Sequence, residues 1–198
     1  LFQSAQFHAT EMATYNYVGH QSQVTGTWPN KMVRDAGYQL PLTFPMTGNP
    51  NAWYPIPDDS NQVESIAGGT TMTASESLAT LITDANTSPP GHRIHLLGID
   101  GFNADNREIG VGHAYNASST YRNYYAIHAT RRSASDIFLT GVAFADRNSN
   151  GRYDLNEGIG GVTIQAGGQS TTTNTAGGWS IKVPTAGTYT VTSHGGDF

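Results

Sequence analysis

The chain has 198 residues, enough for one medium domain or for one domain with a small partner. Its formal net charge is −5, and Arg131-Arg132 is the only cluster of basic residues, so it lacks the electrostatic footprint of a nucleic-acid-binding protein. It has no cysteine, which excludes disulfides and thiolate metal sites, and no apolar run long enough to cross a bilayer. Any metal must therefore be held by histidine, carboxylate or carbonyl groups.

The first 17 residues or so predict a helix, because apolar residues recur at three- and four-residue steps. We expect this helix to end at Gly19, with His20 just beyond its last turn. Taken alone, His20 is either an exposed partner of the helix dipole or a site residue. Leu1 already falls inside the helical pattern and no signal peptide precedes it, so we expect the chain to be a fragment of something longer.

Residues 21–62 are rich in Gly, Pro, Asn, Ser and Thr and predict a long connecting loop that walls a cleft, with one short helix near Trp28 to Ala36. Thr73-Ala74-Ser75-Glu76 is a capping-box pattern and predicts a helix from about Ala74 to Asp84. A carboxylate at that C-terminal end opposes the helix dipole, which suggests a cationic neighbour for Asp84. A solvated loop aspartate is the alternative.

A Pro89-Pro90-Gly91 turn precedes an apolar run and predicts a short helix with His92 in its first turn. Residues 108–116 and 123–130 alternate apolar and polar positions around a polar turn, which predicts a hairpin. His113 and His128 lie on these strands, and we interpret each as a hydrogen-bonded sheet histidine rather than a ligand.

The composition changes after Arg131-Arg132, and we place a domain boundary near residue 134. Beyond it, four short β-rich runs separated by turn residues predict a small all-β sandwich, at residues 137–145, 161–166, 178–183 and 188–193. The second domain is expected to lack its last strand or strands.

The segment from Asp146 to Glu157 has the spacing of a calcium-binding loop. Oxygen-bearing side chains stand at loop positions one, three, five, nine and twelve, glycine stands at six, and the residue at seven completes the set through its backbone. The predicted ligands are Asp146, Asn148, Asn150, Arg152, Asp154 and Glu157. Strands rather than helices flank the loop, so we expect a structural calcium site; an Asn/Gly-rich turn without metal is the alternative.

Six short blocks in residues 1 to about 132 carry a family resemblance. They are Ala5-Gln6-Phe7-His8-Ala9-Thr10-Glu11-Met12-Ala13, Gly19-His20-Gln21-Ser22, Arg34-Asp35-Ala36-Gly37-Tyr38, Glu64-Ser65-Ile66-Ala67, Ser88-Pro89-Pro90-Gly91-His92-Arg93 and Glu108-Ile109-Gly110-Val111-Gly112. In this order they resemble the bacterial, SCP-like branch of the CAP superfamily (cysteine-rich secretory, antigen 5 and pathogenesis-related proteins).

The CAP resemblance implies an α+β fold for residues 1–134, an α-β-α sandwich whose central cleft carries two histidines and two acids. By position these are His20, Glu64 and His92, with Asp84 as a looser match for the second acid. The family's Gly-Glu-Asn-Ile stands here as Val63-Glu64-Ser65-Ile66, and the family's first helix is absent ahead of Leu1. Residues 135–198 resemble the B-type, prealbumin-like repeats of bacterial surface adhesins, which implies an extracellular or cell-surface protein.

Two imidazoles and one or two carboxylates in a cleft suit zinc or a similar divalent cation with open positions for water. The chain has no Gly-x-Ser-x-Gly, His-Glu-x-x-His or cysteine nucleophile, which favours binding of a cation and an extracellular lipid, peptide or surface component over catalysis. A metal-dependent hydrolase or peptidase acting through His20, Glu64 and His92 is the first alternative. A structural adhesion protein with a vestigial cleft is the second.

Overall fold

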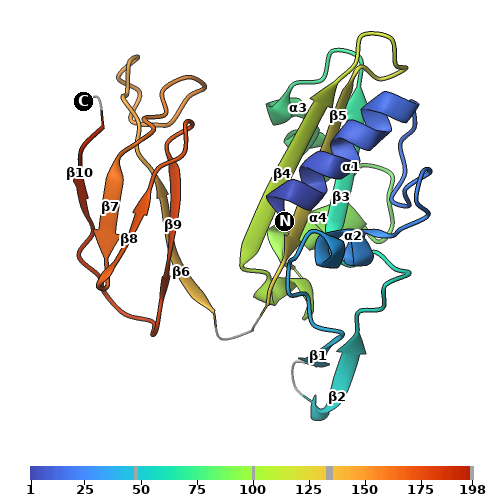
Figure 1. The fold of residues 1–198 in the computed structure, drawn as a ribbon, viewed down its shortest axis with the longest axis horizontal. Coiled ribbons are helices and arrows are strands. Elements are labelled where there is room, and N and C mark those ends of the chain that lie inside the picture. The colour runs from blue at the N-terminus through green and yellow to red at the C-terminus, as the bar shows by residue number, and fades with distance from the viewer. Residues whose placement is uncertain (47–48, 100, 133–135, 197–198) are drawn as a thin grey trace. The chain divides into compact units, whose positions relative to one another are not determined.

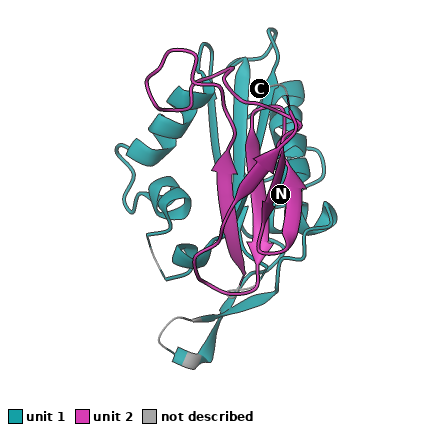
Figure 2. Cartoon of the chain, turned by 90° about the vertical axis from the view of Figure 1, so that its left-hand side faces the viewer, with its two compact units in different colours: residues 1–134 teal, residues 135–198 magenta. Residues whose placement is uncertain are grey.

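The computed structural model describes residues 1–46, 49–99, 101–132 and 136–196. The chain forms two compact units, residues 1–134 and 135–198, coloured separately in Figure 2. Residues 133–135, where the composition changes, lie outside the described part. No helix within that part is long and apolar enough to span a membrane.

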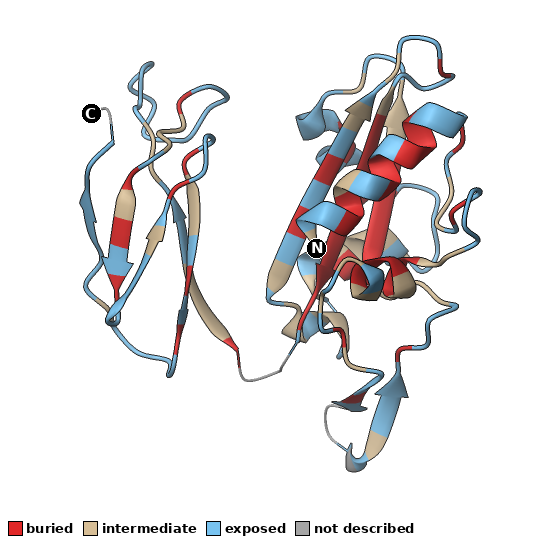
Figure 3. Cartoon of the chain, in the orientation of Figure 1, coloured by how far each residue is buried: buried red, intermediate tan, exposed pale blue. Residues whose placement is uncertain are grey.

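The first unit is built on a three-stranded antiparallel sheet in the order β3 (Glu64–Gly69), β5 (Asn123–Thr130) and β4 (Glu108–Tyr115). The predicted hairpin of β4 and β5 is confirmed. The central strand β5 is buried along nearly its whole length (Figure 3). Because β3 has a partner on one side only, residues that leave either face of the sheet can meet beyond its edge.

Helix α1 (Phe2–Tyr15) packs on one face of this sheet through small residues. Glycines on β4 allow the close approach: a Cβ on Gly110 or Gly112 would lie 2.3 Å from the helix backbone. The helix ends at Tyr15, followed by Asn16 in the left-handed conformation at φ 57°, and not at Gly19 as the sequence predicts. The cause is local, since asparagine tolerates the left-handed cap almost as well as glycine does.

Helices α3 (Ala74–Thr83) and α4 (Gly91–Leu97) lie against the other face (Figure 1). The predicted capping box at Thr73 and Glu76 is present, with reciprocal hydrogen bonds. Side chains of β3 alternate between the two layers, so that Ile66 packs with α1 and Ala67 packs with Leu81 of α3. The same alternation determines toward which face of the sheet each site residue of β3 points.

Residues 21–62 contain more structure than the sequence indicates. The predicted short helix is α2 (Pro29–Asp35), but a hairpin of β1 (Thr43–Met46) and β2 (Asn49–Pro55) follows it. The hairpin's proline and asparagine content hides the alternation that would reveal strands. A short 3₁₀ turn, η1 (Asn103–Asp105), follows α4.

The second unit is all β among its described residues. One sheet pairs β6 (Ile137–Val142) with β9 (Gly178–Val183), and the other has the order β10 (Thr192–His194), β7 (Thr163–Ala166) and β8 (Gln169–Thr172). Val162 and Ile164 share one core with Ile181 and Val183. Strand β8 was not predicted, because its Gln-Ser-Thr-Thr sequence has no apolar alternation.

Candidate functional site

The loop that carries His20 is held in place by a buried acid of α1. Glu11 accepts hydrogen bonds from the Tyr17 hydroxyl at 2.5 Å and from Ser22 Oγ at 2.7 Å. Burial and the bond to Glu11 raise the pKa of Tyr17, which keeps its hydroxyl a donor. Because the two tethers lie on either side of His20 in the sequence, they fix the path of the chain at that histidine.

Glu64 begins the edge strand β3 and turns its side chain toward α1, where three imidazoles surround it. Its Oε2 lies 2.5 Å from His8 Nδ1 and 2.8 Å from His128 Nε2, and its Oε1 lies 2.8 Å from His20 Nδ1. His128 is the register partner of Glu64 on β5. Burial alone would raise the pKa of Glu64, but the hydrogen bonds from the three histidines outweigh it and hold that pKa well below its usual range. Glu64 is therefore a buried carboxylate.

His128 bridges Ser4 and Glu64 through its two ring nitrogens. Ser4 Oγ donates to the carbonyl of Leu1 at 2.8 Å and lies 2.8 Å from His128 Nδ1. Nε2 of the same ring faces Glu64 Oε2. With a proton on both nitrogens, His128 forms a fully buried ion pair with Glu64.

The buried group of His8, Glu64 and His128 could also hold a metal ion. One ligand atom from each lies within 4.8 Å of the others, and no other group of three such side chains occurs in the described part of the chain. His8 Nε2 is buried and has no hydrogen-bond partner among the described residues. Glu64 Oε2 also lies at hydrogen-bond distance from both imidazoles, so protons can occupy these two contacts in place of a metal.

A second carboxylate and imidazole pair comes from the other face of the sheet. Asp84 follows α3 in the left-handed conformation, and its Oδ1 lies 2.9 Å from His92 Nδ1 while its Oδ2 accepts the His92 backbone N–H at 2.9 Å. Asp84 thus stands at the first turn of α4, where the helix dipole favours a negative charge. Burial opposes the ionised form of Asp84, but its bonds to His92 and Arg93 lower its pKa overall. The positive neighbour that the sequence predicts for Asp84 corresponds to the N-terminal end of α4 together with His92.

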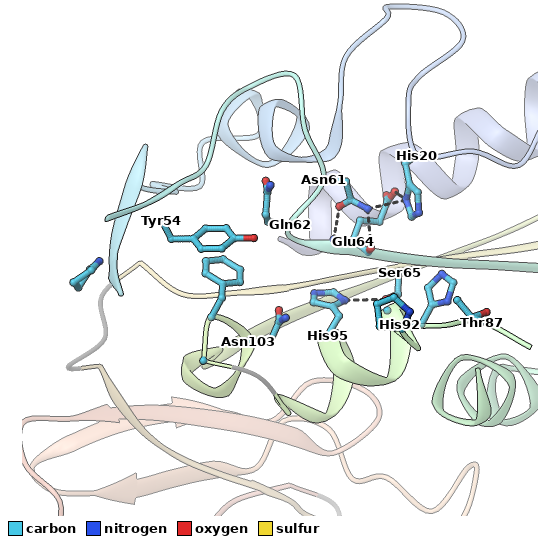
Figure 4. A pocket seen from close by; sticks show the side chains of 15 residues that line it. His20, Tyr54, Asn61, Gln62, Glu64, Ser65, Thr87, His92, His95 and Asn103 are labelled. Atoms are coloured by element: carbon cyan, nitrogen blue, oxygen red, sulfur yellow. Dashed lines mark hydrogen bonds and ion pairs between the residues drawn. The ribbon is translucent and has the colours of Figure 1, made fainter. Parts of the chain in front are cut away.

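The two pairs meet beyond the edge of β3. The rings of His20 and His92 lie with centroids 6.5 Å apart and tilted by 35°, and each side chain is 33 % exposed (Figure 4). Both line a cavity of about 610 Å³. Each ring has Nδ1 at hydrogen-bond distance from its carboxylate, and His20 Nδ1 also lies 3.0 Å from Asn61 Nδ2. Among the described residues neither Nε2 has a hydrogen-bond partner. Both Nε2 atoms are therefore available to a ligand.

The structure thus brings together all four residues predicted for the cleft, His20, Glu64, Asp84 and His92. The carboxylates, however, are occupied by the imidazoles they orient: the side chain of Glu64 is fully buried, and both oxygens of Asp84 have donors. Sequence reasoning missed Ser4, His8 and the contribution of His128, because their meeting depends on sheet register and on helix packing. His113 is a sheet histidine as interpreted, stacked on Tyr125 and bonded to Asn123.

The calcium-type loop closes on itself through backbone donors. Asp146 accepts the N–H groups of Asn150 and Gly151, and Glu157 accepts those of Arg147 and Asp154. Gly151 at loop position six has φ 72°, which the sharp turn requires. The side-chain amides of Asn148 and Asn150 donate to Asp154 Oδ2, and Arg152 donates its N–H to Asn150 Oδ1. The fold of the loop is compatible with the prediction, and calcium remains a prediction.

Comparisons of the chain with protein-family models, with curated proteins and with solved structures found no match.

Proposed function

We propose that residues 1–134 form a CAP-type α-β-α sandwich domain that binds a divalent cation through His20 and His92 and presents it to an extracellular ligand. One observation carries this proposal: each imidazole has Nδ1 at hydrogen-bond distance from a buried carboxylate, and both imidazoles line the same cavity. Metal-binding histidines characteristically donate their other ring nitrogen to a carboxylate, which fixes the tautomer and raises the basicity of the ligand. Zinc is the preferred ion for such neutral imidazoles with open positions.

The proposal assigns different roles to the histidines and to the acids. Glu64 and Asp84 orient the imidazoles, and the cation takes its remaining ligands from water or from the bound molecule. Binding is favoured over hydrolysis because Glu64, the one carboxylate among the described residues that line the cavity, has both oxygens engaged by imidazoles. A hydrolase that used Glu64 as its general base would need this carboxylate free to accept a proton from water.

Zinc titration of purified protein tests this function. We expect binding at one site in the first unit, lost in His20→Ala and in His92→Ala, and unchanged in His113→Ala, which removes an exposed histidine of β4. His8→Asn keeps a donor toward Glu64 and probes the buried group separately. Zinc binding that survives both cleft variants, or that is lost only in His8→Asn, contradicts the proposal. Turnover of a peptide and ester library that disappears in Glu64→Gln would favour the hydrolase instead.

We further propose that residues 135–198 form a prealbumin-like adhesin sandwich whose Asp146 to Glu157 loop binds calcium. Asp146 and Glu157 already gather backbone N–H groups from the loop, which pre-forms the tight turn that calcium-binding loops need. The adhesin resemblance supports an extracellular or cell-surface location. Cleavage of the protein when intact cells are treated with protease, or its detection in the culture medium, tests that location.

A further inference from the structure

The cavity that contains His20 and His92 has two chemically different ends. The histidines occupy one end, and Tyr54 lies at the other with its hydroxyl directed inward (Figure 4). Phe102 and Pro45 complete the second end. At about 610 Å³ the cavity has the size of a small-molecule site and is too small for a folded partner.

The aromatic end is built from segments far apart in the sequence. Tyr54 of β2 stacks on Phe102, with ring centroids 4.9 Å apart and a tilt of 23°. Phe102 in turn meets the edge of Phe44 on β1 at 5.7 Å. Offset aromatic contacts of this kind add stability beyond area burial, so Phe44 supports the wall that Tyr54 and Phe102 form.

A buried arginine fixes this wall. Arg131 is 1 % exposed, and its guanidinium lies 4.3 Å from the centroid of the Phe44 ring. Its Nη1 donates to the carbonyl of Phe102 at 3.0 Å and lies 3.0 Å from Asp105 Oδ2. A buried charge is costly unless it is paired, so these contacts define one arrangement of the segment that carries Phe102.

The polar groups between the two ends are already used within the protein. Asn61 Oδ1 accepts the backbone N–H of Glu64, Gln62 Nε2 donates to Ser60, and Ser65 Oγ bonds to His95 Nδ1. Among the described residues that line the cavity there is no lysine or arginine. A ligand therefore finds imidazole nitrogens at one end, and the aromatic rings of Tyr54 and Phe102 with the Tyr54 hydroxyl at the other.

We propose that the cavity binds a small amphiphilic acid, with its oxygen head on the cation at His20 and His92 and an aromatic or alkyl group against Tyr54 and Phe102. The position of the ligand's oxygen head rests on the proposed function, because it requires a cation at His20 and His92. The apolar subsite does not depend on it, because it is formed by the aromatic wall alone.

Hydroxamates test both parts, since they place two oxygens on zinc and can carry different tails. We expect benzohydroxamate to bind the zinc-loaded protein at least about tenfold more tightly than acetohydroxamate, from burial of the ring. Tyr54→Ala and Phe102→Ala should remove this factor and leave acetohydroxamate unaffected. Trp53→Ala is the matched control, because Trp53 is 59 % exposed on the same strand and does not line the cavity.

Equal affinity of the native protein for the two hydroxamates would overturn the proposal, as would a factor that survives in both wall variants. If neither hydroxamate binds because the protein holds no zinc, the proposed function fails. Binding of the fluorescent dye 1-anilinonaphthalene-8-sulfonate to metal-free protein then tests the apolar subsite by itself. Fluorescence enhancement lost in Tyr54→Ala but kept in Trp53→Ala supports the subsite. Enhancement that is absent, or the same in both variants, refutes it.

Discussion

His128 Nε2 lies 2.8 Å from Glu64 Oε2, and both side chains are fully buried between the sheet and α1. These two residues are also register partners on neighbouring strands. The pair therefore links the pairing of β3 and β5 to the orientation of His20, which shares the same carboxylate.

Removal of one partner of this pair should be strongly destabilising. His128→Ala leaves the Glu64 carboxylate buried without its counter-charge, and we expect it to lower the free energy of unfolding by about 3–5 kcal/mol. Ser4→Ala removes the partner of His128 Nδ1 and the hydrogen bond to the carbonyl of Leu1, at an expected cost of about 1–3 kcal/mol. Urea unfolding measures both, with the exposed His113→Ala as a control; a loss under 1 kcal/mol in His128→Ala would refute the ion pair.

The same carboxylate should make stability depend on acid pH. The histidines hold the pKa of folded Glu64 below the value of about 4.3 for an unfolded chain, so the unfolded state binds more protons. Its contribution is present above that pH and is lost as the pH falls toward the folded pKa. In urea unfolding between pH 5 and pH 3, Glu64→Gln should flatten the slope by up to about 1.4 kcal/mol per pH unit. Parallel slopes in the two proteins would argue against a Glu64 that is ionised in the folded state.

Asp84 should affect both α4 and the cation. Asp84→Ala removes the acceptor for the His92 backbone N–H, at an expected cost of about 1 kcal/mol for a lost helix cap. It also frees the His92 ring, and loss of such a supporting carboxylate typically weakens metal binding by about 10- to 100-fold. Calorimetric zinc titration measures this, with Asp59→Ala, an exposed acid outside the cavity, as the control. Unchanged zinc affinity in Asp84→Ala would exclude a supporting role.

The calcium loop should respond to chelation independently of the cleft. Calcium at about one hundred times its dissociation constant would stabilise the second unit by about 2.7 kcal/mol, which raises the melting temperature of a small domain by roughly 10 °C or more. Asp146→Ala should abolish that shift, whereas Arg147→Ala should keep it, because Arg147 serves the loop only through its backbone N–H. A melt that is the same with calcium and with chelator would remove the calcium assignment.

Local patterns predicted the helices of the first unit and the β4–β5 hairpin, but not strands β1, β2 and β8. Thr73 and Glu76 define the start of α3 by themselves, and the Pro90-Gly91 turn places His92 in the first turn of α4. Helix α1 ends earlier than expected, because Asn16 adopts the left-handed cap.

The CAP resemblance predicts that His20, Glu64, Asp84 and His92 lie in one cleft. The roles of Ser4 and His128 could not be predicted, because they depend on the register of β5 against β3 and on the depth at which α1 packs. Tyr54 and Phe102 were missed for a similar reason: the hairpin that carries Tyr54 has no apolar alternation, and its partner lies some fifty residues away.

The ring nitrogens of His20 and His92 give the most direct test of the cation site. In ¹⁵N-detected imidazole spectra recorded during zinc addition, we expect the Nε2 signals of both residues to shift as zinc binds, while both Nδ1 atoms keep their protons toward Glu64 and Asp84. Signals of His20 and His92 that stay unchanged while those of His8 and His128 move would contradict the account and place the metal in the buried group.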